Sequence, residues 1–142
     1  MRHAFLLIII SVVIVSCNGN LLNSNVDCSE CYYIEPDSAD LVINLTIDER
    51  FQYVPLVVYQ GEVEDNQIEY TDTAYASPYY LWVRVDQKYS VKAEYKKSHA
   101  TLFVVDGTRI KTNHVQDECD EDCYTIEKET LDVQIKDEFR DF

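Results

Sequence analysis

Glycine, proline and histidine are scarce in this 142-residue chain, which has three of each and a single tryptophan. So little glycine and proline, together with 46% hydrophobic residues, argues against a disordered chain. Basic residues are also few, with 12 Lys and Arg against 26 Asp and Glu and a formal net charge of −14. Because so acidic a surface repels phosphate, the composition predicts no nucleic-acid partner.

The common signatures of catalysis are missing as well. The chain has no HExxH motif, no nucleophile elbow and no glycine-rich phosphate loop. His3 lies in the N-terminal segment, while His99 and His114 fall in polar, turn-like or strand-like sequence. We therefore predict a protein that is not an enzyme and that needs no cofactor.

The longest apolar run is at the N-terminus, from Ala4 to Val15, interrupted only by Ser11. It is shorter than the roughly 20 residues that span a membrane, and it has the length of a signal-peptide core. The run ends in Ile14-Val15-Ser16-Cys17, which resembles the lipobox of bacterial lipoproteins.

The lipobox resemblance implies that residues 1–16 are a cleaved signal peptide and that Cys17 carries the lipid anchor. Asn18 follows the cysteine, in place of the aspartate that resembles an inner-membrane retention signal. The expected location is therefore the outer membrane of a Gram-negative envelope, on its periplasmic or surface face. Residues 17–27 would be the lipidated N-terminus and tether, and residues 28–142 a single domain.

Short segments with alternating apolar residues fill that domain, a pattern typical of β-strands. We expect Tyr79–Val85 and Lys88–Tyr95 to pair as a hairpin around Asp86-Gln87. A second hairpin is expected between Thr101–Val105 and Arg109–Thr112, because Asp106-Gly107 suits a type I′ turn. The further expected strands are 41–47, 54–59, 68–71, 124–126 and 131–135. The pattern predicts an all-β, antiparallel β-sandwich of about 7–9 strands without an amphipathic helix.

Three segments, Thr71-Asp72-Thr73, Tyr79–Val85 and Tyr89–Tyr95, resemble the centre of transthyretin-like (prealbumin-like) or carboxypeptidase-regulatory-like domains. The likeness covers residues 54–95 and departs from the family at Ala74–Pro78, where a glycine is usual. It implies an accessory or binding module and supplies no catalytic residues. An Ig-like sandwich is the alternative that the strand pattern leaves open.

With Cys17 lipidated, four cysteines remain: Cys28, Cys31, Cys119 and Cys123. An even number in an exported domain predicts two disulfides. Joining the first pair to the second closes a much longer loop than closing each pair on itself, so we expect cross-pairing in one of its two connectivities. A tetrahedral zinc site is one alternative, which an oxidising compartment disfavours. A redox pair at Cys28 and Cys31 is another, which the acidic neighbour Glu30 disfavours.

The acidic residues Asp117, Glu118 and Asp120–Asp122 raise the question of a calcium site. An EF-hand-type loop would need a glycine at Thr125 and a carboxylate at Leu131, and the chain has neither. We therefore predict no metal and expect a solvated loop, with a calcium site of another type left open.

Aromatic residues provide the functional hypothesis. If Leu81 and Val83 face the core, then Tyr80, Trp82 and Arg84 lie on the opposite face of the same strand. Such rings beside polar groups suit stacking on a sugar or a protein contact, unless that face is covered or the rings pair across strands. We predict a lipid-anchored binding module for a glycan or an envelope protein. The alternative is a structural or assembly component that docks by a sheet edge.

Overall fold

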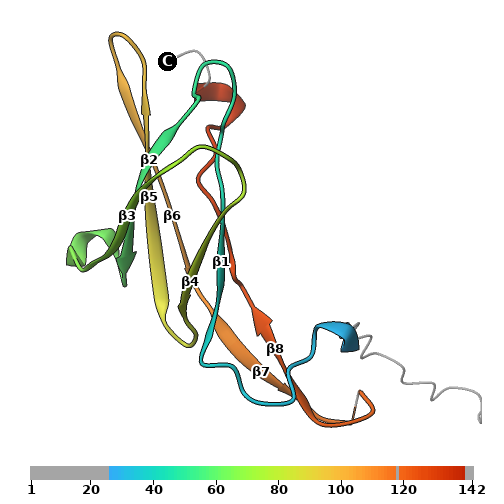
Figure 1. The fold of residues 1–142 in the computed structure, drawn as a ribbon. Coiled ribbons are helices and arrows are strands. Elements are labelled where there is room, and N and C mark those ends of the chain that lie inside the picture. The colour runs from blue at the N-terminus through green and yellow to red at the C-terminus, as the bar shows by residue number, and fades with distance from the viewer. Residues whose placement is uncertain (1–25, 118, 140–142) are drawn as a thin grey trace, which may run out of the picture.

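A computed structural model describes residues 26–117 and 119–139 of the chain. These residues form an all-β structure, as the alternating pattern predicts (Figure 1). Its strands are β1 (Ser38–Asn44), β2 (Val54–Gln60), β3 (Ile68–Ala74), β4 (Tyr79–Arg84), β5 (Lys88–Lys96), β6 (Thr101–Arg109), β7 (Lys111–Val115), β8 (Cys123–Glu127) and β9 (Thr130–Asp132).

Helical structure in the same part of the chain is confined to three short 3-10 turns: η1 (Cys28–Glu30), η2 (Val63–Asp65) and η3 (Asp137–Phe139). None of the helices described is long and apolar enough to cross a membrane. The predicted signal peptide, residues 1–16, and the predicted lipidation site, Cys17, lie outside the described residues.

The strands form two main sheets and a separate hairpin. One sheet has the order β4-β1-β9 and the other the order β3-β2-β5-β6, while β7 pairs only with β8. All pairs are antiparallel except β1 with β9, which run parallel. In Figure 1 the β7–β8 hairpin extends away from the two sheets toward η1, at the end opposite η3.

The hydrophobic core lies between the two sheets. Alternate residues from both sheets are almost fully buried there, among them Leu41, Ile43, Leu56, Val58, Val91 and Ala93. The chain returns to this core after β8, where Leu131, Val133 and Ile135 are buried and the intervening residues are exposed. The alternation in the sequence therefore identifies correctly the inward faces of β1, β5 and the segment from Leu131 to Ile135. For β2 the dense apolar run predicts a strand covered on both sides, whereas Val54, Leu56 and Val58 are buried and Pro55 and Val57 are only partly so.

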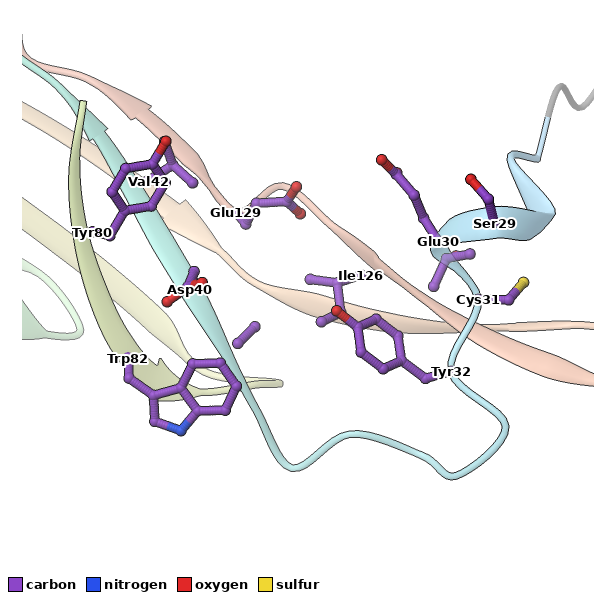
Figure 2. A pocket seen from close by; sticks show the side chains of 12 residues that line it. Ser29, Glu30, Cys31, Tyr32, Asp40, Val42, Tyr80, Trp82, Ile126 and Glu129 are labelled. Atoms are coloured by element: carbon purple, nitrogen blue, oxygen red, sulfur yellow. The ribbon is translucent and has the colours of Figure 1, made fainter. Parts of the chain in front are cut away.

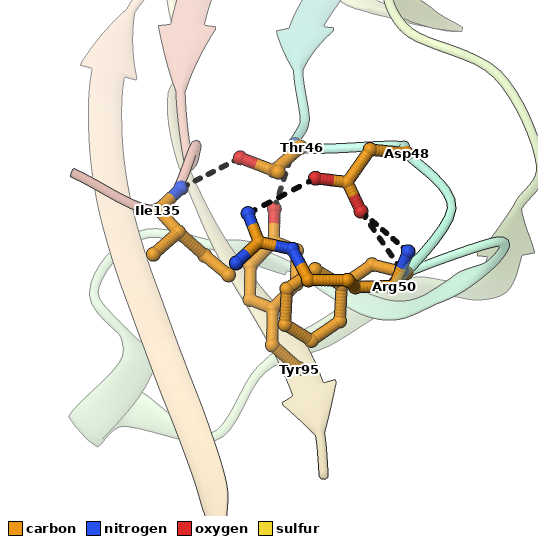
Figure 3. Close-up of polar contacts among 6 residues, drawn as sticks. Thr46, Asp48, Arg50, Tyr95 and Ile135 are labelled. Atoms are coloured by element: carbon orange, nitrogen blue, oxygen red, sulfur yellow. Dashed lines mark hydrogen bonds and ion pairs between the residues drawn. The ribbon is translucent and has the colours of Figure 1, made fainter. Parts of the chain in front are cut away.

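A buried tyrosine joins three segments at one end of the core. The Tyr95 hydroxyl accepts a hydrogen bond from the Thr46 N–H at 3.1 Å and donates one to the Val133 carbonyl at 2.8 Å. The Thr46 hydroxyl in turn accepts from the Ile135 N–H at 2.8 Å (Figure 3). Burial raises the pKa of Tyr95, so the hydroxyl keeps the proton that it donates.

The predicted hairpin of Tyr79–Val85 with Lys88–Tyr95 is wrong in its pairing. Both segments are strands, but β4 pairs with β1, whereas β5 pairs with β2 and β6 in the other sheet. Asp86, with φ 58°, lies in the connection that carries the chain from one sheet to the other. A hairpin and such a crossing give the same alternation, because in both cases each strand buries one face against the same core.

The predicted type I′ turn at Asp106-Gly107 is also wrong. β6 runs without interruption from Thr101 to Arg109 and pairs along its whole length with β5. Gly107 lies opposite Ser90, and a Cβ added to Gly107 would be 3.0 Å from the Ser90 Oγ. The serine cannot move away freely, because its hydroxyl donates a hydrogen bond of 2.7 Å to the Gly61 carbonyl. The glycine is thus required by a close approach between two strands.

We expect Gly107→Ala to lower the free energy of unfolding by about 1–2 kcal/mol, since it displaces the buried Ser90 hydroxyl from its hydrogen bond. In a Ser90→Ala background the added methyl group meets no hydroxyl, and most of that cost should disappear. Denaturant unfolding of the two single variants and the double variant measures this coupling. A cost that persists unchanged without the serine would contradict the close-approach explanation.

Candidate functional site

The outer face of the β4-β1-β9 sheet borders a groove with a volume of about 440 Å³. The opposite wall is built from η1, the residues that follow it, and β8. Figure 2 shows the side chains of this groove, with Tyr80 and Trp82 on one side and Tyr32 on the other. The volume is in the range of small-molecule sites.

Strand register explains how the sheet side of the groove forms. Trp82 of β4 lies opposite Asp40 of β1, and Tyr80 lies opposite Val42 two residues along. Because side chains two residues apart share a face, these four project together from the sheet. The rings of Tyr80 and Trp82 are 58% and 68% exposed, so no described part of the chain covers this face.

Two disulfides position the opposite wall. Cys28 is bonded to Cys119 and Cys31 to Cys123, which confirms the predicted cross-pairing and selects one of its two connectivities. Next to them, Tyr32 forms an isolated β-bridge with Tyr124, in which each N–H donates to the other's carbonyl at 2.8 Å. The segment after η1 is therefore fixed to the β7–β8 hairpin.

The groove is acidic. Carboxylates of Glu30, Asp40 and Glu129 contribute to its lining, and no lysine, arginine or histidine does. The remaining contributors are small or apolar: Ser29, Cys31, Ala39, Val42, Thr125 and Ile126. The site thus combines aromatic rings with negative charge.

The structure separates Arg84 from the two rings with which the sequence groups it. Arg84 is on the same face of β4, but it lines a neighbouring hollow with Glu35, Asp37 and Asp86. Tyr79 does not line the groove, and its hydroxyl donates a 2.6 Å hydrogen bond to Asp72. Burial, followed by that bond, raises the pKa of Tyr79 well above its usual range.

Sequence reasoning did not identify the carboxylates of the groove. Asp40 immediately precedes the expected strand 41–47, whereas β1 begins at Ser38 and brings Asp40 opposite Trp82. An extension of the alternation by one residue would have placed Asp40 on the outer face. Glu30 and Glu129 come from η1 and from the β8–β9 turn. The cysteine spacing predicts that the segment around Glu30 is joined to the C-terminal part of the chain, but it does not predict that either segment lies beside β4.

The structure also places the candidate metal ligands. Among the described residues, the group of three or more possible ligand atoms that lie within 4.8 Å of one another consists of the sulfur atoms of Cys31, Cys119 and Cys123. Disulfide bonds occupy these sulfur atoms. The described part of the acidic loop, Asp117 and Asp120–Asp122, forms no comparable group of carboxylates. Both histidines among the described residues, His99 and His114, are exposed.

Comparison of the chain with protein-family models, with curated proteins and with solved structures finds no match.

Proposed function

We propose that the protein is a lipid-anchored, non-catalytic binding module of the Gram-negative outer membrane, whose ligand, a glycan or a protein, occupies the groove beside β4. The observation that carries this proposal is the exposure of Tyr80 and Trp82 at the edge of a defined hollow. Large rings exposed beside a concave surface are the residues on which binding energy concentrates in known interfaces.

The pairing of the cysteines supports the lipid anchor. Cys28, Cys31, Cys119 and Cys123 pair with one another, so Cys17 is not needed for any disulfide. The chain enters the described structure beside η1, at the end of the molecule where the β7–β8 hairpin lies (Figure 1). An anchor at Cys17 would thus hold this end toward the membrane. Mass spectrometry that detects an unmodified Cys17 would overturn this part of the proposal.

Strand order favours the transthyretin-like over the Ig-like type of β-sandwich. In Ig constant-type domains the first and second strands share a sheet. Here β1 and β2 lie in different sheets, and β2 pairs with β3 and β5. This order supports the resemblance found in residues 54–95, with the β7–β8 hairpin as an addition to the sandwich.

Substitution of Trp82 by alanine tests the binding module. We expect Trp82→Ala to weaken binding about tenfold or more on a glycan array or in capture of envelope proteins, because it removes the largest exposed ring of the groove. Its melting temperature should hardly change, since the side chain is 68% exposed. Tyr75→Ala is the matched control, because Tyr75 is 74% exposed and lies outside the groove. Equal binding by both variants would refute this site.

One observation favours assembly by a sheet edge as a second candidate. β6 is an edge strand of nine residues, and its outward side chains Phe103 and Val105 are 53% and 52% exposed. An exposed apolar edge of this length is suited to strand addition. Replacement of Val105 by lysine should then abolish co-purification of a partner and leave the groove's binding unchanged.

A further inference from the structure

The carboxylates of the groove face a common space. Glu30 comes from η1, Asp40 from β1 and Glu129 from the turn between β8 and β9. In Figure 2 they surround the hollow between the Tyr80 and Trp82 rings on one side and the Tyr32 ring on the other. Three separate elements, two of them consecutive in the chain and the third near its C-terminal end, thus contribute negative charge to one place.

These charges have no counterions within the described part of the protein. No ion pair or side-chain hydrogen bond there involves the carboxylates of Glu30, Asp40 or Glu129. The groove contains no basic side chain, and the whole chain has a net charge of −14. The acidic lining therefore does not serve a salt bridge between the two walls, and its field attracts cations from solution.

The aromatic rings of the groove also favour a cationic ligand. Tyrosine and tryptophan attract a cation over their faces, and arginine makes this contact more often than lysine. The planar guanidinium also stacks on a ring while its N–H groups pair with a carboxylate. Asp40 lies directly across the strand pair from Trp82, so one guanidinium can reach both.

We propose that this groove binds an arginine-bearing segment of a partner protein. The inference rests on the proposed function of the groove and specifies its ligand. One cation cannot neutralise carboxylates on different walls, so a segment with two basic residues fits the groove better than a single small amine. A neutral glycan would leave this charge uncompensated, and an anionic one would be repelled.

The single tryptophan of the chain makes the test direct, because Trp82 alone reports indole fluorescence. The full-length protein, purified in detergent, is titrated with the peptide acetyl-Gly-Arg-Gly-Arg-Gly-amide. The same peptide with citrulline in place of arginine is the isosteric neutral control. We expect a saturable change in Trp82 emission with the arginine peptide, at least about tenfold weaker binding of the citrulline peptide, and a loss of affinity as NaCl is raised.

Charge-removing variants locate the effect. Asp40→Asn combined with Glu129→Gln should weaken the arginine peptide about tenfold or more. Glu64→Gln combined with Glu69→Gln removes the same charge from exposed positions outside the groove and should change binding less than twofold. This comparison separates a local site from general attraction to an acidic protein.

The outcomes distinguish the inference from the proposed function. Equal binding of the arginine and citrulline peptides, or equal effects of the two double variants, would overturn the arginine preference. The binding module would still stand if Trp82→Ala reduced capture of a glycan or an envelope protein. If no peptide changed the emission and Trp82→Ala altered no binding in any assay, both proposals would be wrong.

Discussion

Removal of both disulfides should lower the free energy of unfolding by about 7 kcal/mol, whereas removal of either one alone should cost only about 2–3 kcal/mol. The reason is their parallel arrangement. Cys28–Cys119 and Cys31–Cys123 span 91 and 92 residues, and each closes the same long loop. While one remains, the unfolded chain is still closed, and the other restricts only the few residues between the two bridges.

Chain entropy gives the sizes of these effects. Closing a loop of about 90 residues restricts the unfolded state by about 4.6 kcal/mol, and closing the small second loop adds about 2–3 kcal/mol. The joint cost should therefore exceed the sum of the two single costs by about 2 kcal/mol. A chain with only one of the two bridges therefore keeps most of the stabilisation that both bridges give together.

Urea unfolding of the Cys28→Ser/Cys119→Ser variant, the Cys31→Ser/Cys123→Ser variant and the variant with all four substitutions measures this cycle. Each bonded pair must be removed together, because Cys31 Sγ lies 3.8 Å from Cys119 Sγ and a lone cysteine could form a new bridge there. Strictly additive costs would contradict the parallel-loop account.

The sequence predicts most of what depends on local pattern. Alternation identifies the strands around Leu41 and Val91 and their buried faces, because a two-residue period is imposed by the strand itself. The cysteine spacing predicts cross-pairing, which follows from loop length. The outward position of Trp82 follows from the inward position of Val83 in the same strand.

Features that depend on which segments meet could not be predicted. The alternation of β4 and β5 is the same whether they pair with each other or belong to two sheets, and only the contacts of β4 with β1 decide it. Asp106-Gly107 has the composition of a turn, but its glycine serves the approach of Ser90. The sequence does not predict that Glu30 and Glu129 line the groove for the same reason, since tertiary contacts bring them there.

Substitution of Tyr95 by alanine should lower the free energy of unfolding by about 5 kcal/mol, the second largest effect that we expect. Its ring is 1% exposed and packs edge-on against Phe51 with 5.3 Å between centroids. Its hydroxyl joins the N–H of Thr46 to the carbonyl of Val133. The variant thus leaves a cavity and two buried backbone groups without a partner.

Tyr95→Phe divides this effect into its parts. Phenylalanine preserves the packing against Phe51 and removes only the hydroxyl, so we expect a loss of about 1–3 kcal/mol from the unpaired Thr46 N–H and Val133 carbonyl. Tyr80→Phe is the control, because the Tyr80 ring is 58% exposed and its hydroxyl should contribute almost nothing. If Tyr95→Phe were as stable as Tyr80→Phe in urea unfolding, the hydrogen bonds of the Tyr95 hydroxyl to Thr46 and Val133 would not stabilise the fold. The cost of Tyr95→Ala would then come from packing alone.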